Sequence, residues 1–260
     1  KQKLEDGSII SGQTTIDHGP GAAFDDRTIR IPKGIIQSGQ FGRRDNDHRR
    51  LATLTGTKPI LVVRVTDGDG QVIADSPYQM SDNVFGTYGD PNNLKSQLTA
   101  CSHGVLNVEA GAISPETAKA DEGVIEVTVN TRLAVDNRYV MHDAVTAAVQ
   151  EKLGITLPGP YQQVMYVMKN CQVGCGYAAY AYVGHWLSVY QDVYYAMTGV
   201  QVHELGHNFG MSHSGGTDGQ AYTDHTGMMG NPLYSDDAGR MCYNGAKNYM
   251  LAPDWYPNGG

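Results

Sequence analysis

One eleven-residue stretch, His203–His213, constrains this chain more than any other part of the sequence. It places three imidazoles and one carboxylate within a few residues of one another. On an α-helix, His203 and His207 lie four residues apart, so their side chains leave the same face one turn apart. Two neutral imidazoles at this spacing can bind one zinc ion. Glu204 can reach a metal-bound water without being a ligand itself.

The rest of the stretch predicts how the site is completed. Gly210 has no Cβ, so it can adopt a positive φ and turn the chain out of the helix. That turn would bring back His213 as a third ligand and leave one coordination position for water, which is the arrangement of a catalytic zinc. A chance match to such a pattern has a probability on the order of 1 in 10,000. A helix that is merely rich in structural histidines is therefore disfavoured.

The pattern H-E-x-x-H-x-x-G-x-x-H is that of the metzincin zinc endopeptidases, which this chain resembles. Residues 224–230 resemble the Met-turn of that family, a tight turn whose methionine lies beneath the metal. We expect Met229, rather than Met228, to be that methionine. Other segments resemble the gametolysin family (peptidase M11), which are secreted metallopeptidases that digest cell-wall glycoproteins. The matching segments are residues 62–65, 81–86, 175–183, 186–190 and 240–248.

The resemblance implies an α+β, metzincin-like fold, in which a twisted mixed β-sheet carries a backing helix and an active-site helix. It implies a secreted, zinc-dependent endopeptidase acting on proteins or peptides, with extracellular matrix or cell-wall glycoproteins as candidate substrates. Zinc would lower the pKa of its water to about 7. Glu204 would take a proton from that water during attack and deliver it to the leaving amine.

Local patterns predict the elements of this fold. Residues 60–66, 123–129 and 163–168 have the β-branched or alternating character of strands. Residues 67–70, Asp-Gly-Asp-Gly, predict a hairpin turn rather than a calcium loop. Asn92 or Asn93 can cap a short helix that ends at Cys101.

Two longer helices follow. Asn137 and Gly154 can cap and stop the backing helix. The active-site helix is expected over 194–208. The apolar stripe of the backing helix is predicted to consist of Val140, Ala144, Ala147, Ala148 and Leu153.

The aromatic stretch 171–190 predicts two adjacent strands, one of them at a sheet edge. In metzincins the corresponding edge strand pairs with an extended substrate, whose main chain supplies the hydrogen bonds. Tyr180, Tyr182 and Trp186 are equally compatible with ordinary packing against the sheet. Both interpretations remain open.

Charge and hydropathy exclude several partners. The net charge is −8, but residues 1–58 hold ten Lys and Arg against seven Asp and Glu, whereas 59–260 hold nine against twenty. An acidic catalytic region argues against nucleic acid or an anionic membrane as a partner. No apolar run reaches the roughly 18 residues of a membrane helix. We expect a monomer.

Four cysteines, Cys101, Cys171, Cys175 and Cys242, lack the paired spacing of a structural zinc site. Beside a motif of secreted proteases, disulfide bonds are their favoured use. Four cysteines allow three pairings, and the sequence does not choose among them.

The N-terminal residues 1–56 are set apart from the predicted catalytic domain, 57–260. The dibasic pair Arg49-Arg50 suggests a pro-segment with a processing site, and Asp45 or Asp47 could then cap the zinc in a latent zymogen. The alternative is a strand and loop that remain part of the mature domain. A permanently capped cleft would make the chain a non-catalytic, metzincin-fold binding protein, although such a protein would not need Glu204.

Overall fold

The computed structural model describes residues 54–112, 122–170, 176–217, 220–231 and 241–255, except the side chains of 252–254, and four short strands nearer the N-terminus. The chain forms two compact units, Lys1–Arg50 and Leu51–Gly260. The first contains two antiparallel strand pairs. These pairs are β1 (Gln2–Lys3) with β2 (Ile9–Ile10), and β3 (Ala23–Phe24) with β4 (Ile29–Arg30).

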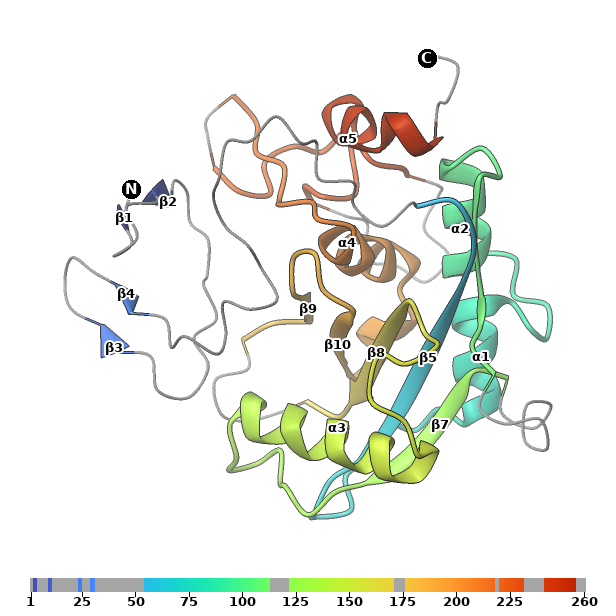
Figure 1. Ribbon diagram of the computed structural model, residues 1–260, viewed down its shortest axis with the longest axis vertical. Helices are drawn as coiled ribbons and strands as arrows, with labels where there is room; N and C mark the ends of the chain where they lie inside the picture. Colours follow the sequence, from blue (N-terminus) through green and yellow to red (C-terminus); the bar gives the residue numbers. More distant parts are fainter. Residues whose placement is uncertain are drawn as a thin grey trace. The chain divides into compact units, whose positions relative to one another are not determined.

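The second unit is built on a six-stranded mixed sheet, in the order β6-β5-β8-β10-β9, with β7 also paired to β5 (Figure 1). Strand β5 pairs in parallel with β6, β7 and β8, and β8 pairs in parallel with β10. Only β9 runs antiparallel, at the edge beside β10. The strands are β5 (Gly56–Thr66), β6 (Leu106–Ala110), β7 (Val124–Thr128), β8 (Gln163–Met168), β9 (Ala179–Ala181) and β10 (Leu187–Gln191).

Helices cover both faces of the sheet (Figure 1). Because strand side chains alternate between faces, Leu61 and Val63 of β5 pack with helix α3, whereas Ile60 and Val62 pack with the helices on the other face. We call these the α3 face and the α4 face. The helices are α1 (Pro77–Phe85), α2 (Leu94–Cys101), α3 (Arg138–Leu153), α4 (Thr198–Asn208) and α5 (Gly245–Trp255).

The predicted caps are confirmed. The Asn93 side chain accepts a hydrogen bond from Ser96 N, and the Asn137 side chain accepts from Tyr139 N and Val140 N. Gly154 ends α3 with φ of 65°, a left-handed conformation that glycine adopts without a Cβ penalty.

The predicted apolar stripe of α3 is right in part, because Ala144, Ala148 and Leu153 pack against the core. Val140 and Ala147 are exposed, while the buried face consists of Met141, His142, Val145 and Val149. The polar His142 lies on this face because its ring contacts the Tyr180 hydroxyl of β9. That contact comes from a distant strand, so the local pattern could not indicate it.

The predicted hairpin after β5 is also wrong. All three strands that pair with β5 run parallel to it. The Asp67 carboxylate instead accepts hydrogen bonds from Asp69 N at 3.0 Å, Gln71 N at 2.7 Å and Leu133 N at 2.9 Å. The turn is real, but it leads from β5 toward α1, and hydrogen bonds from Leu133 N and to the Thr131 carbonyl tie it to the loop before α3.

The active-site helix begins later than predicted. Residues Asp192–Ala196 form a short 3₁₀ helix, η2, and Met197 is extended before α4 begins at Thr198. The Tyr195 hydroxyl in η2 donates to the Asp75 carboxylate, which anchors this segment on another part of the chain.

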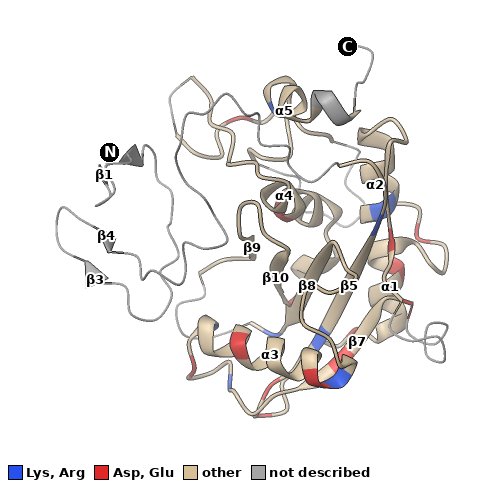
Figure 2. Cartoon of the chain, viewed as in Figure 1, with Lys and Arg blue, Asp and Glu red and all other residues tan. Residues whose placement is uncertain are grey.

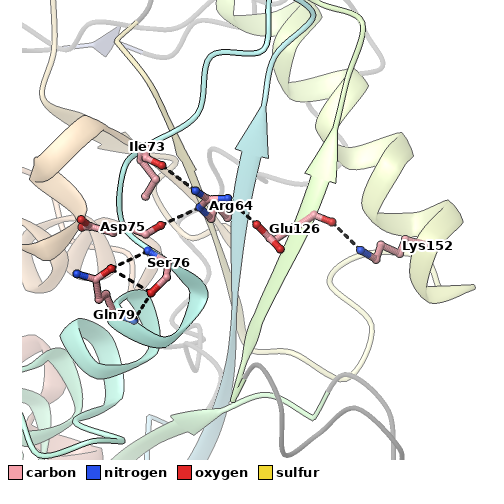
Figure 3. Close-up of polar contacts among 7 residues, drawn as sticks. All are labelled: Arg64, Ile73, Asp75, Ser76, Gln79, Glu126 and Lys152. Carbon is pink, nitrogen blue, oxygen red and sulfur yellow. Dashed lines mark hydrogen bonds and ion pairs between the residues drawn. The ribbon is translucent and has the colours of Figure 1, made fainter.

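Arg64 of β5 holds the Asp75 loop in place (Figure 3). Its guanidinium donates to the carbonyls of Asp75 and Ile73, each at 2.8 Å, and pairs with Glu126 at 2.5 Å. Because Asp75 in turn binds Tyr195, the central strand helps to fix the start of α4.

A disulfide bond joins Cys101 of α2 to Cys242, just before α5. Cys171, Cys175 and the predicted processing site at Arg49-Arg50 lie outside the described residues. Among the helices described, none combines the length and apolar character needed to cross a bilayer.

Candidate metal centre

Three histidines converge at the end of α4. His203 and His207 lie one helical turn apart on α4, with ring centroids separated by 4.9 Å. Gly210, with φ of 94°, turns the chain after the helix. His213 therefore returns to the other two, and one ligand atom from each residue lies within 4.8 Å of the others. The structure thus brings together all three histidines predicted from the motif.

Backbone carbonyls select the tautomer of two of these imidazoles. His203 Nδ1 donates to the Met228 carbonyl at 2.5 Å, and His207 Nδ1 donates to the Met211 carbonyl at 2.8 Å. Since a carbonyl oxygen can only accept, each Nδ1 carries the proton and each Nε2 keeps a lone pair. Metal-binding histidines are commonly oriented in this way.

Burial keeps the imidazoles neutral. It lowers the pKa of His203 to about 3 and that of His213 to about 4, with nearby His207 adding to both shifts. Burial also lowers the pKa of His207, and the Lys247 ammonium contributes. Neutral imidazoles at physiological pH are the form that binds a metal ion.

Glu204 is the one acidic residue of α4 and is 5% exposed (Figure 2). Burial raises the pKa of its carboxyl group to about 8. Its Oε2 atom is enclosed without a hydrogen-bond partner. A buried carboxyl group with a pKa near neutrality has the properties of a general acid–base group.

The segment carrying Met229 packs beneath α4. A Cβ placed on Gly206 would lie 2.2 Å from Met229 Sδ, so the methionine fits against a helix position that has no side chain. Met229 is fully buried, and its carbonyl accepts from Ser214 N at 2.7 Å. Met228 contributes its carbonyl to His203. The two neighbouring methionines therefore play different structural parts.

The edge strand lies against the same helix. Gly184 N donates to the His207 carbonyl at 2.9 Å, and the Asn208 side chain donates to the carbonyls of Tyr182 and Leu187. The two predicted adjacent strands are confirmed as β9 and β10. Tyr180, Tyr182 and Trp186 are half-buried and pack on the α3 face.

One aromatic residue at the histidine cluster was not selected from the sequence. The Tyr222 ring centroid lies 4.0 Å from that of His213 and 6.0 Å from that of His203. Its φ is 67°, an uncommon conformation for a residue with a side chain. No spacing rule links Tyr222 to the motif, so only the three-dimensional structure reveals this contact.

The chain is similar in structure to several solved proteins. OgpA from Akkermansia muciniphila is 14% identical, with a TM-score of 0.50, over 82% of this chain and 65% of that one. Archaemetzincin from Methanopyrus kandleri is 14% identical, with a TM-score of 0.40, over 76% of this chain and 95% of that one. Mature mirolysin from Tannerella forsythia is 13% identical, with a TM-score of 0.39, over 76% of this chain and 90% of that one.

Such identities concern the fold alone. The α+β fold expected from the sequence, a mixed sheet with a backing helix and an active-site helix, is confirmed by the structure itself. No curated protein matches the chain. The model of the gametolysin peptidase M11 family matches residues 73–257, which is well over half of the chain. The chain therefore belongs to the gametolysin family of metallopeptidases.

Proposed function

We propose that this protein is a zinc-dependent endopeptidase that hydrolyses internal peptide bonds. The observation that carries the proposal is the convergence of three imidazole nitrogens within 4.8 Å of one another. A buried glutamate, Glu204, lies on α4, the helix that carries two of the three histidines. The donor set suits zinc, because the neutral imidazoles of His203 and His207, held by carbonyls, present their Nε2 lone pairs and His213 adds a third imidazole.

His203, His207 and His213 would hold the metal. When bound, zinc supplies a water of lowered pKa and a Lewis acid for the scissile carbonyl. The Glu204 carboxylate accepts a proton from the attacking water and returns it to the leaving amine nitrogen. Met229 supports the site from below as the Met-turn methionine.

The substrate is a protein or peptide bound in an extended conformation along β9. Support comes from the position of β9, which ends the sheet, and from the loop after it, where Gly184 N donates to the His207 carbonyl of α4. A strand added to this edge would lie beside the histidines and would gain main-chain hydrogen bonds. Secretion and an extracellular glycoprotein substrate are further parts of the proposal, supported by family membership and by the Cys101–Cys242 disulfide.

Metal analysis combined with peptide cleavage tests this function. The purified protein is expected to contain one zinc per chain, to cleave a mixed peptide library, to lose activity with phenanthroline and to regain it with added zinc. His213→Ala should lose zinc on dialysis. Retention of full zinc occupancy in that variant would mean that another residue is the third ligand. Metal-independent cleavage would overturn the proposal.

We also propose that the protein is made as a zymogen that is activated by cleavage after Arg50. The boundary between the two compact units, Lys1–Arg50 and Leu51–Gly260, supports this proposal because it coincides with that peptide bond. Limited trypsin treatment should raise peptidase activity and yield a new N-terminus at Leu51. Equal activity of the intact 260-residue chain would contradict latency.

A further inference from the structure

The contact between α4 and β10 contains an unusual group of buried polar atoms. Among the described residues, eight buried side-chain atoms have no hydrogen-bond partner, and five of them belong to these two elements. Most buried polar groups in proteins are paired, so such a concentration requires an explanation. The five atoms are Ser188 Oγ, Tyr190 Oη, Gln201 Oε1, Glu204 Oε2 and Asn208 Oδ1.

Strand geometry directs two of these groups toward α4. Leu187 and Val189 of β10 pack on the α3 face, whereas Tyr190 packs on the α4 face. Side chains two residues apart on a strand share a face, so Ser188 and Tyr190 both point toward α4. Both are fully buried.

Helix geometry brings Glu204 to the same place. Asn208 Nδ2 donates to the Leu187 carbonyl at 3.0 Å, which fixes where the end of α4 meets β10. The four helical residues from Asn208 back to Glu204 span about 6 Å along α4. The two strand residues from Leu187 to Val189 span about 6.6 Å along β10. Glu204 is thereby level with Val189, between Ser188 and Tyr190.

Electrostatics agree with this placement. Burial raises the pKa of Tyr190 well above its usual value, and the Glu204 carboxylate adds to the shift. The Ser188 hydroxyl opposes the shift as a hydrogen-bonding neighbour of the Tyr190 hydroxyl, so Tyr190 is close to both groups. The two hydroxyls nevertheless lie outside the geometry of a good direct hydrogen bond, and Glu204 Oε2 has no partner among the described residues. Three buried polar groups that face one another form the usual partner set of one buried water.

We propose that Tyr190 is a positioning residue for the general base, linked to Glu204 Oε2 through one buried water that Ser188 also holds. This inference rests on the proposed function of Glu204. Of the two carboxylate oxygens, only Oε2 is an enclosed atom without a partner. Holding Oε2 from behind fixes the carboxylate plane, so that Oε1 faces the attacking water. The water link also satisfies polar atoms that would otherwise destabilise the fold.

Conservative variants test the link. Tyr190→Phe keeps the ring and removes only the hydroxyl. We expect its kcat on a fluorogenic peptide, chosen from the cleaved library, to fall about tenfold, the effect of one hydrogen bond to a charged group. KM and zinc content should be unchanged. Ser188→Ala, which removes a second partner of the water, should lower kcat by a smaller factor, again without affecting KM.

Tyr166→Phe is the matched control, because Tyr166 is a fully buried tyrosine on the α3 face whose hydroxyl pairs with Thr146. It should leave kcat within about twofold, as expected for a residue away from the reacting groups. An unchanged kcat in both Tyr190→Phe and Ser188→Ala would overturn the inference. So would an equal fall in kcat in the Tyr166→Phe control.

A readout that is independent of activity uses the metal-free protein. If the Tyr190 hydroxyl is linked to Glu204, Tyr190→Phe should lower the melting temperature by about 2–4 °C in a domain of this size. If the hydroxyl has no partner, its removal should raise the melting temperature, and the inference fails. Glu204→Gln separates the two claims. Full activity in that variant would refute the proposed function, whereas an inactive Glu204→Gln with a normal Tyr190→Phe would refute only the role of Tyr190.

Discussion

The two faces of the sheet differ in how their buried polar groups are paired by hydrogen bonds. On the α3 face, the Tyr166 hydroxyl pairs with Thr146 at 2.8 Å, and His142 contacts the Tyr180 hydroxyl. On the α4 face, Glu204 is buried with an oxygen that no described protein group pairs directly, and three imidazoles crowd together. The first arrangement adds stability, whereas the second sacrifices stability to hold reactive groups in place. Substitutions on the α4 face should therefore mainly affect activity or metal binding, and those on the α3 face should affect only stability.

The largest effect is expected from Glu204→Ala. Turnover should fall by at least about 100-fold, because the proposed general base is lost, while zinc content should stay the same. The free energy of unfolding of the metal-free protein should change little, since relief of a buried carboxyl group whose charged form is disfavoured offsets the loss of its water link to Tyr190. Turnover assays, metal analysis and calorimetry measure the three quantities. Normal turnover with zinc bound would remove Glu204 from the mechanism.

Gly230→Ala should damage the site by steric overlap. A Cβ at this position would lie 1.6 Å from the Asp224 carbonyl oxygen, which is backbone and cannot rotate away. We expect a loss of about 3 kcal/mol in the free energy of unfolding and weaker zinc retention. Gly245→Ala is the control, because open space surrounds that position. Equal denaturation midpoints for the two variants would show that the turn adapts.

On the α3 face, His142 should make stability depend on pH. Burial and the Arg138 guanidinium lower its pKa from 6.5 to about 4 in the folded protein. Between these values the unfolded chain binds more protons, so the contribution of His142 to stability is lost as pH falls from 6.5 toward 4. The full loss is about 3 kcal/mol. Urea titrations across this range should show a shallower pH slope for His142→Asn, and parallel curves would contradict this prediction.

The smallest effect is expected from Tyr166→Phe. Removing the hydrogen bond to Thr146 should lower the free energy of unfolding by about 1 kcal/mol, with peptidase activity unchanged. Chemical denaturation and a peptide assay on the same samples test this. A large loss of activity would contradict the expectation that substitutions on the α3 face affect only stability.

Local chemistry made much of this fold predictable. Asn137 and Gly154 mark the ends of α3 because a side-chain cap and a left-handed glycine act within a few residues. The eleven-residue motif likewise predicted that three histidines would meet, because helix periodicity and one turn at Gly210 suffice to bring them together.

Features that depend on distant contacts were not predictable. His142 faces the core because its ring contacts the Tyr180 hydroxyl. The short helix η2 is distinct from α4, and its Tyr195 hydroxyl is anchored on the distant Asp75 carboxylate. The pairing of Cys101 with Cys242 required the position of α2, which no local pattern provides. The contact of Tyr222 with His213 depends in the same way on the path of a loop.

The Cys101–Cys242 disulfide has a consequence for what proteolytic cleavage of this chain can do. The bond closes a covalent ring of the intervening chain, with a sequence separation of 141 residues. Every candidate site residue, from Ser188 to Met229, lies inside this ring. A single backbone cut anywhere within it leaves both pieces in one molecule, and they separate only when the disulfide is reduced. A nicked chain can therefore keep its histidines together after the backbone between Cys101 and Cys242 has been broken.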